Sequence, residues 1–288
     1  QDLQPPTLDD VRAARERVLS QMRPSPLMRH PMLDAESGLE IWVKHENHNP
    51  TGAFKIRGGL NLIGSLNPEA RARGVVTAST GNHGQSIALA CRTYGVRCRV
   101  FVPDGNNPDK NAAMRAYGAI VDEGGHDFDE ARERCEAHAA QSRARYVHSA
   151  NEPLLIAGVG TYALEISESL HAVDTILVPI GGGSGACGLI TVRNELGLKT
   201  KIIGVQAANA DAVYRSWKGS ERVAGTSADT FAEGMATRLG QFLRPDELTT
   251  VDAHAPHALQ AVIAAQPAAR PSSPSVRFTA LVVPATTR

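Results

Sequence analysis

Residues 74–95, GVVTASTGNHGQSIALACRTYG, contain the pattern that decides the fold of this chain. A short run rich in valine and threonine leads into a small polar turn, and apolar residues at helical spacing follow as far as a glycine. Such a run is typical of a buried strand, and the spacing after it is typical of a helix that ends at a glycine. The stretch therefore predicts a strand over 74–79 and a helix over 82–95.

The same alternation continues on both sides of this stretch. Further strands are predicted over 39–46, 97–103, 119–124, 145–150, 174–180 and 201–207, and further helices over 8–22, 108–118, 127–142, 156–170 and 185–197. Residues 23–33, RPSPLMRHPML, are predicted to be a loop. Strands that alternate with helices of about a dozen residues indicate an α/β fold with mostly parallel sheets flanked by helices.

The composition is that of a soluble globular chain with one large or two modest domains, since 42% of its 288 residues are hydrophobic and 21% are charged. Lysine and arginine together number 30, as do aspartate and glutamate, so no global charge favours nucleic acid or an anionic membrane as a partner. No apolar run has the length of a membrane span, and the first residues lack the apolar core of a secretory signal. We expect a cytoplasmic location.

The cysteines and histidines match no metal pattern. Cys91, Cys98, Cys135 and Cys187 form no C-x-x-C pair, so we expect free, mostly buried thiols in a reducing compartment. His45 and His48 lie in HENH, which is not the H-E-x-x-H motif of zinc enzymes. We therefore predict no metal site.

A glycine-rich loop, VPIGGGSGACG, follows the strand at 174–180 and precedes a helix. Without side chains, Gly181, Gly182, Gly183 and Gly185 can bring their N–H groups close to an anion, and the helix N-terminus adds partial positive charge. This loop predicts a phosphate site; the alternative is a tight turn with no ligand.

Two other phosphate-binding classes fit the loop less well. GSGACG satisfies G-x-G-x-x-G, but the next strand ends near Gln206, where a dinucleotide site requires an acidic residue. No lysine of the P-loop type follows the glycines. Both NAD and a P-loop nucleotide are therefore disfavoured.

Two more stretches follow predicted strands, where parallel sheets bind ligands. The turn from Ser79 through Thr80, Gly81 and Asn82 to His83 has hydroxyls and N–H groups that suit a carboxylate, although it would also serve simply to cap a helix. In NPTGAFKIRGG, Lys55 follows a tight turn among apolar residues, where a lowered pKa would make its amine nucleophilic. Alone, Lys55 would be taken for an ordinary exposed lysine.

Taken together, the three stretches fit one small molecule. An imine-forming lysine, a phosphate site and an asparagine turn suit a phosphorylated aldehyde held at both ends, which is pyridoxal 5′-phosphate. The glycines after Lys55 would let the following helix pack closely.

At this point the sequence resembles a known family. KHENHNPTGAFKIRGG, STGNHGQ, AGVGTYALEI and PIGGGSGACG, in this order, are similar to segments of the fold-type II pyridoxal-phosphate enzymes (the tryptophan synthase β-like fold), and most similar to the serine/threonine dehydratase group. The resemblance covers about residues 20 to 240. It implies a lyase, an ammonia-lyase or dehydratase of amino-acid metabolism, acting as a homodimer on a small amino-acid substrate.

The resemblance also implies roles for individual residues. Lys55 would be catalytic and would hold the cofactor as a Schiff base. The other cofactor-binding residues would be Phe54 beside the ring, Asn82 at the 3′-oxygen, and Gly181, Gly182, Gly183, Ser184 and Gly185 at the phosphate. Ser79, Thr80, Gly81 and His83 would bind the substrate carboxylate. TFAEGMATR resembles a segment near which some members bind a cation, which makes Glu233 a weak candidate.

The reaction implied is β-elimination from a hydroxy amino acid such as threonine or serine, giving a 2-oxo acid and ammonia. Related racemases carry a serine where Thr80 stands, and KIR differs from the K-D-R of cysteine synthases; both details favour elimination. An amino-acid racemase of the same fold and an inactive chain with an altered C-terminus stay open.

The end of the sequence departs from the family. Residues 241–288 contain no glycine, and nothing after Asp252 is acidic. In the family, a hydroxyl or thiol near the end of the chain faces the pyridine nitrogen. No segment here matches the one that carries it, and Thr286 and Thr287 are the only hydroxyls suggested for that role. We expect a large cofactor-binding domain (1–69 plus 148–288), a small domain (70–147) and an atypical tail (253–288), which is either flexible or altered.

Overall fold

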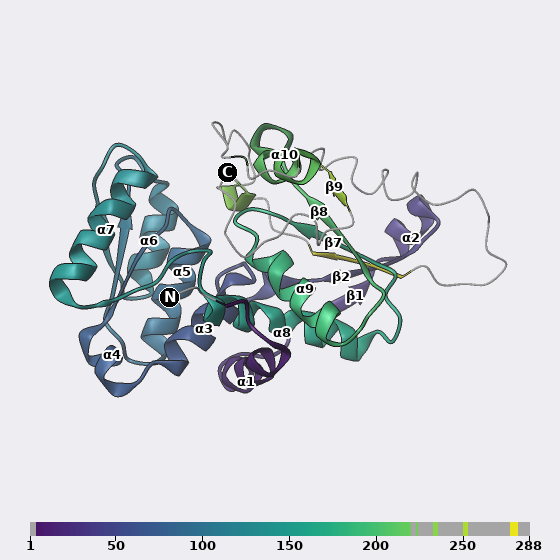
Figure 1. The fold of residues 1–288 in the computed structure, drawn as a ribbon, viewed down its shortest axis with the longest axis horizontal. Coiled ribbons are helices and arrows are strands. Elements are labelled where there is room, and N and C mark those ends of the chain that lie inside the picture. Colours follow the sequence, from purple (N-terminus) through teal and green to yellow (C-terminus); the bar gives the residue numbers. More distant parts are fainter. Residues whose placement is uncertain (1–3, 220–222, 224–232, 236–249, 253–276, 282–288) are drawn as a thin grey trace. The chain divides into compact units, whose positions relative to one another are not determined.

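The computed structural model describes residues 4–219, 223, 233–235, 250–252 and 277–281 (Figure 1). The chain divides into two compact units, each with its own sheet. Unit 1 comprises residues 1–23 and 49–161, and unit 2 comprises residues 24–48 and 162–288. The predicted domain bounds given above stay a prediction.

Unit 1 is built on a four-stranded parallel sheet. Its strands are β3 (Val75–Ala78), β4 (Cys98–Val102), β5 (Ile120–Glu123) and β6 (Arg145–Tyr146), in the spatial order β5-β4-β3-β6. Its helices are α1 (Leu8–Leu19), α3 (Lys55–Ser65), α4 (Pro68–Arg73), α5 (Asn82–Thr93), α6 (Pro108–Ala116) and α7 (Phe128–Ser142). The predicted alternation of strands and helices is confirmed here.

Alternate residues of β3 and β4 supply two separate cores, one on each face of the sheet. Val75 and Val100 lie in the large cluster that contains Ile87 of α5 and Met114 of α6. Val76, Ala78 and Phe101 lie in a second cluster with Cys135 of α7. Helices α5 and α6 therefore cover one face and α7 the other, as Figure 1 shows.

Helix α3 is buried along almost all of its length within unit 1. Ile56, Leu60 and Ile63 recur at helical spacing and belong to the large cluster. A Cβ atom on Gly58 would lie 2.8 Å from the Leu155 carbonyl oxygen, and one on Gly59 would lie 2.5 Å from Ser86 Oγ. These glycines allow the close packing that the sequence predicted.

Unit 2 is built on a six-stranded sheet. Its strands are β1 (Leu27–Arg29), β2 (Glu40–Lys44), β7 (Thr175–Pro179), β8 (Lys201–Val205), β9 (Thr250–Asp252) and β10 (Arg277–Leu281), in the order β1-β2-β10-β7-β8-β9. Its helices are α2 (Pro31–Ser37), α9 (Ser184–Glu195) and α10 (Ala212–Gly219), with short 3-10 turns at Glu46–His48, Ala208–Ala210 and Glu233–Met235. Helix α8 (Pro153–Ser169) runs from unit 1 into unit 2.

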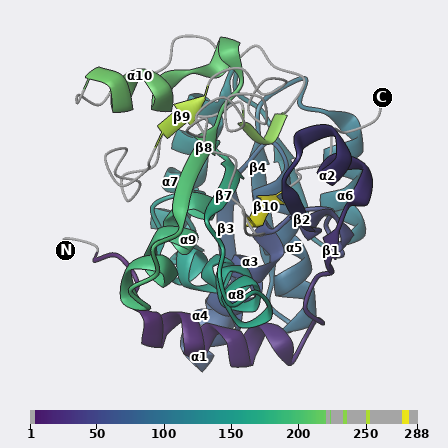
Figure 2. The same cartoon turned by 90° about the vertical axis from the view of Figure 1, so that its right-hand side faces the viewer.

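All strand pairs of this sheet are parallel except that of β1 with β2. One core cluster holds Ile41, Leu177 and Ile203, with Leu33 of α2 packed against it. Figure 2 shows β7 and β8 side by side with α9 next to them, in agreement with the packing of α9 against both strands. The predicted α/β class with mostly parallel sheets is confirmed.

The prediction of a loop over 23–33 is wrong. Leu27–Arg29 pairs with β2 as an antiparallel edge strand, and α2 starts at Pro31 and ends at Ser37, with Gly38 as its C-cap. Proline is favoured at the first position of a helix, and a left-handed glycine is favoured just after its end. Pro31 and Gly38 therefore mark the two ends of a short helix.

Several predicted elements have different bounds, and two of the differences have a clear local cause. Helix α8 starts at Pro153 rather than residue 156, because proline fits the first helical position. Strand β6 ends at Tyr146 rather than residue 150, because the chain turns at His148, whose side chain accepts hydrogen bonds from the next residues.

Strand β10 falls inside the segment 253–288 that the sequence marks as atypical. Its five residues pair with β2 on one side, and Phe278, Thr279 and Ala280 pair with β7 on the other. The four cysteines are free and buried, as predicted. Among the described residues, no helix is both long and apolar enough to cross a membrane.

Candidate active site

Lys55 is the first residue of α3 and directly follows a tight turn. Gly52 adopts a left-handed conformation (φ +64°) and donates a backbone hydrogen bond to Asn49. The backbone of Lys55 is fixed by the Ser86 hydroxyl, which donates to its carbonyl oxygen at 2.6 Å. Its half-buried side chain extends so that Nζ donates to the Ser149 carbonyl oxygen at 3.3 Å and lies 5.7 Å from the centre of the Phe54 ring.

The predicted carboxylate turn lies at the start of α5, in the same unit as Lys55. The buried Ser79 hydroxyl accepts hydrogen bonds from the N–H groups of Gly81 and Gly84 and so closes the turn. Thr80 is exposed and Asn82, the first helical residue, is half-buried. The N–H groups of the first helical turn have no acceptor inside the helix, so this turn can bind an anion.

The His83 side chain is buried and bonded within the fold. Its Nε2 lies 2.9 Å from the Thr77 hydroxyl, which in turn donates to the Val147 carbonyl oxygen. Burial lowers the pKa of His83 to about 3, and the charges of Lys55 and His148 act in the same direction. The imidazole is therefore neutral, and only the backbone of His83 is placed to serve the turn.

Sequence reasoning missed the residues that Lys55 contacts after β6. Ser149 accepts from Lys55 Nζ, and His148 accepts backbone hydrogen bonds from Ala150 and Asn151. The available signal was the polar run HSAN after a parallel strand, where ligands commonly bind. Because residues 145–150 were predicted to be a strand, the turn within this run was not predicted.

The glycine loop lies in unit 2, between β7 and α9. Gly183 adopts a left-handed conformation (φ +95°) and forms the N-cap of α9, and its carbonyl accepts from the Cys187 N–H at 2.9 Å. This is the first bond within the helix, and a helix N-terminus of this kind is a favourable place for an anion. Tyr162 of α8 donates from its hydroxyl to the Gly185 carbonyl oxygen at 2.5 Å and fixes this first turn.

These residues fit a phosphorylated aldehyde. The start of α9 offers N–H donors, a helix dipole and glycines that do not obstruct a phosphate group, while Lys55 offers an amine whose Nζ donates to the Ser149 carbonyl oxygen. The structure brings Phe54, Lys55 and residues 79–83 together in unit 1, and Gly181, Gly182, Gly183, Ser184 and Gly185 together in unit 2. The roles given to these residues stay a prediction.

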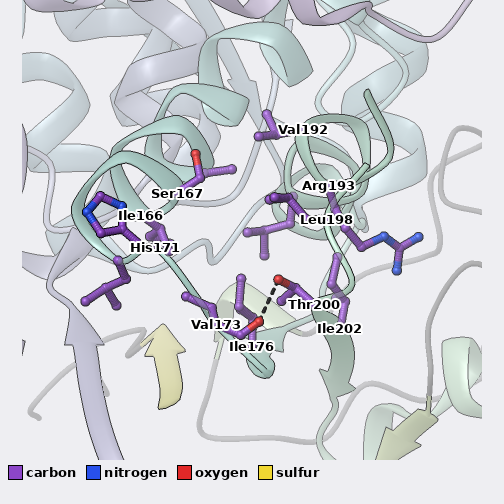
Figure 3. Close-up of a pocket in the computed structure, with 13 residues that line it drawn as sticks. Ile166, Ser167, His171, Val173, Ile176, Val192, Arg193, Leu198, Thr200 and Ile202 are labelled. Carbon is purple, nitrogen blue, oxygen red and sulfur yellow. Dashed lines mark hydrogen bonds between the residues drawn. The ribbon is translucent and has the colours of Figure 1, made fainter. Parts of the chain in front are cut away.

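An apolar cavity in unit 2 is made of other residues. It lies between the ends of α8 and α9 and is lined mainly by side chains such as Ile166, Leu189 and Ile202, while Thr200 Oγ1 donates to the Val173 carbonyl oxygen beside it (Figure 3). Its volume is about 50 Å³. None of the residues predicted to bind the cofactor lines this cavity.

Some predicted residues lie at the edge of what the structure describes. Glu233 begins the short turn Glu233–Met235, and Thr286 and Thr287 lie outside the described residues. Within the described ranges, no group of three or more histidine, cysteine, aspartate or glutamate side chains is arranged to hold a metal ion.

Comparison with known families gives a match over most of the chain. The family model described as "Pyridoxal-phosphate dependent enzyme" matches residues 18–261.

Individual proteins with known functions are also similar to this chain. An L-threonine ammonia-lyase of Geobacter sulfurreducens is 38% identical over 79% of this chain and 57% of its own length. A beta-hydroxyaspartate dehydratase of Paracoccus denitrificans is 32% identical over 81% of this chain and 74% of its own length. The solved structure of maize serine racemase has a TM-score of 0.89 and 25% identity, and the match covers 99% of this chain and 95% of that one. The chain thus spans less than two thirds of the length of the threonine ammonia-lyase.

Proposed function

The chain belongs to the family of pyridoxal-phosphate-dependent enzymes, and we propose that it removes water and then ammonia from a β-hydroxy amino acid. The products would be a 2-oxo acid and ammonia. The observation that carries this proposal is that Lys55, at the start of α3, lies in the same unit as the turn at 79–83, to which the sequence gives the substrate carboxylate. The similarity to an ammonia-lyase and a dehydratase supports it.

We propose that Lys55 binds the cofactor aldehyde through Nζ, and that the other cofactor contacts come from Phe54, Asn82, Gly181, Gly182, Gly183, Ser184 and Gly185. The N–H groups at the starts of α5 and α9 suit a carboxylate and a phosphate respectively. Ser79, Thr80, Gly81 and the backbone of His83 would then bind the substrate carboxylate.

The chemistry divides between cofactor and protein. When bound, pyridoxal phosphate supplies a conjugated ring that stores the electron pair left when the substrate Cα–H bond breaks. Lys55 Nζ would remove that proton and then deliver a proton to the departing β-hydroxyl, so that water leaves. The released enamine reacts with water to give the 2-oxo acid and ammonia, which balances the atoms of the reaction.

Neutral imidazoles beside the lysine favour this use of Nζ. The pKa values of His83 and His148 are both lowered by burial, so neither ring adds a positive charge or a competing proton donor near Lys55 at neutral pH. This is compatible with the proposal that Nζ exchanges a proton with the substrate.

The first test is attachment of the cofactor. The purified full chain should absorb in the visible, and borohydride reduction should fix the cofactor on the tryptic peptide that contains Lys55, as detected by mass spectrometry. Lys55→Arg should abolish both signals, whereas Lys110→Arg, at the start of α6, should leave both unchanged. Absence of the fixed cofactor at Lys55 in the unchanged protein would refute the proposal.

The second test is the reaction. A 2-oxo acid assay over L-serine, L-threonine and 3-hydroxyaspartate should detect product with at least one of them. A cofactor-loaded protein that yields no 2-oxo acid from any of them would instead support the inactive chain.

A racemase is the second candidate, favoured by the likeness to maize serine racemase. Racemisation needs a second acid on the other face of the cofactor, and Thr80 is the exposed hydroxyl at the predicted position. Chiral analysis after incubation with L-serine distinguishes the two, since only a racemase would accumulate D-serine.

We also propose that the enzyme is a cytoplasmic homodimer. The free cysteines suit a reducing compartment, and dimerisation is implied by the family resemblance. Light scattering coupled to size-exclusion chromatography would give a mass near twice that of the chain.

A further inference from the structure

The turn that follows β6 is shaped by one histidine side chain. His148 Nδ1 accepts a hydrogen bond from the Ala150 N–H at 3.0 Å and another from the Asn151 N–H at 2.9 Å. These two bonds bend the backbone immediately after the strand. The turn is thus held by the same kind of contact that asparagine and aspartate make in Asx turns.

The two bonds also fix the state of the ring. A nitrogen that accepts hydrogen bonds carries no proton, so the neutral ring must carry its proton on Nε2. The pKa of His148 is lowered by burial first and then by Arg132 and Lys55, against an opposing effect of Glu136. Both the geometry and the surrounding charges therefore keep Nδ1 free to accept.

Ser149 lies inside this turn, between His148 and its two donors. Its carbonyl oxygen accepts from Lys55 Nζ at 3.3 Å. The opposite end of Lys55, its backbone, is held by Ser86. The Ser149 carbonyl and the Ala150 N–H belong to one peptide group, so the bond from Ala150 to His148 bears directly on the direction of that carbonyl.

We propose that His148 is a positioning residue for Lys55. It accepts two backbone N–H groups and so aims the Ser149 carbonyl at Nζ, which holds the amine ready to bond with the cofactor aldehyde and to return after each turnover. This inference rests on the proposed function. A reacting group held in place in advance reacts faster because less ordering is needed at the moment of reaction.

The test compares three substitutions in the full chain. His148→Ala removes the acceptor, His148→Asn keeps a side-chain oxygen that can accept the same N–H groups, and His126→Ala removes an exposed histidine elsewhere in unit 1 as a matched control. The cofactor is removed by dialysis against hydroxylamine. Pyridoxal 5′-phosphate is then added back, and the growth of the visible absorption of the lysine-bound cofactor is followed with time.

We expect His148→Ala to attach the cofactor about tenfold more slowly than the unchanged protein, as the loss of about one hydrogen bond predicts. His148→Asn should restore the rate to within about twofold, because the acceptor is present again. His126→Ala should match the unchanged protein. A general loss of packing would not be repaired by asparagine, so the rescue separates positioning from mere structural support.

Two outcomes would overturn the inference: attachment by His148→Ala at the unchanged rate, or attachment by His148→Asn as slow as that of His148→Ala. If His148→Ala does not fold, His148→Ser replaces it, because a serine hydroxyl makes such turns more weakly, and its rate should fall between those of the unchanged protein and a tenfold loss. Attachment of the cofactor to Lys55 in the unchanged protein is measured first. If the unchanged protein does not attach it, the proposed function is wrong, and the variants are not compared.

Discussion

Lys44 and Glu165 form an ion pair that is almost completely shielded from water. Nζ lies 2.5 Å from Oε2, and the two side chains are only 1% and 6% exposed. Lys44 also donates to the carbonyl oxygen of Ser25. The pair joins the end of β2 to α8, the helix whose Tyr162 donates to the Gly185 carbonyl oxygen in the first turn of α9.

Removing one member of this pair should destabilise unit 2 strongly. We expect Lys44→Met to lower the free energy of unfolding by about 3–5 kcal/mol, because Glu165 would keep a buried charge without its counter-charge. Urea unfolding followed by tryptophan fluorescence measures this directly, since both tryptophans, Trp42 and Trp217, lie in unit 2.

The double variant Lys44→Met/Glu165→Met is the control. It removes both charges and should recover most of the loss, because an apolar pair of similar size is often as stable as a buried ion pair. If the double variant loses as much as the two single variants added together, the pair does not act as a unit.

The stability of unit 1 should depend on pH through His83. Its pKa is lowered to about 3 in the folded chain, against 6.5 in the unfolded one, so the unfolded state binds more protons between these values. Stability is therefore fully present above pH 6.5 and falls as the pH drops, by about 1.4 kcal/mol per pH unit below pH 6.

His83→Gln tests this dependence, because glutamine can hydrogen-bond to Thr77 but does not titrate. Thermal unfolding followed by circular dichroism between pH 7 and 5 should show a shallower decline in the variant. The lowered pKa values of His45 and His148 contribute with the same sign and remain in both proteins. If stability falls with pH at the same rate in both proteins, His83 does not cause the pH dependence.

Gly158 should tolerate no side chain. A Cβ atom there would clash with the Arg57 carbonyl oxygen and lie 2.8 Å from the Gly58 Cα. We expect Gly158→Ala to lower the melting temperature, through a loss of about 1–3 kcal/mol from overpacking. It should also lower kcat, because α3 begins with Lys55. Gly219→Ala, where nothing lies within 4 Å of the new methyl, is the matched control and should be neutral or slightly stabilising.

Gly183 should be needed for phosphate binding as well as for stability. Its φ of +95° is one that alanine adopts only with strain, so Gly183→Ala should shift the N–H groups at the start of α9. Equilibrium dialysis should show weaker retention of pyridoxal phosphate. Gly197→Ala introduces similar strain at φ +63° just after the same helix, and should cost stability without loss of cofactor. Equal cofactor retention by both variants would contradict a role for the loop.

The regular part of the fold could be predicted because its signals are local. The valines of β3 and β4, the alternation of their faces and the glycine after α5 specify their elements without reference to the rest of the chain. The glycine loop and the turn at 79–83 could be found for the same reason, since strands and helices of recognisable pattern enclose them.

The missed features depend on partners far along the chain. Nothing within Leu27–Arg29 identifies a strand until β2 lies beside it, and the strand length of β6 is cut short by a histidine side chain rather than by proline or glycine. The contact of Lys55 with Ser149 joins residues 94 positions apart. Patterns within a short window carry no information about such contacts.

The position of β10 has a consequence for how the chain is made. Residues 277–281 fill the space between β2 and β7, so the sheet of unit 2 cannot close until almost the whole printed sequence has been synthesised. Until then, the edges of both neighbours present unpaired N–H and C=O groups, which are ready templates for pairing with other chains. The residues that form the core of unit 1 are synthesised earlier, and a ribosome that stalls before Arg277 would release a chain prone to aggregate through its second half.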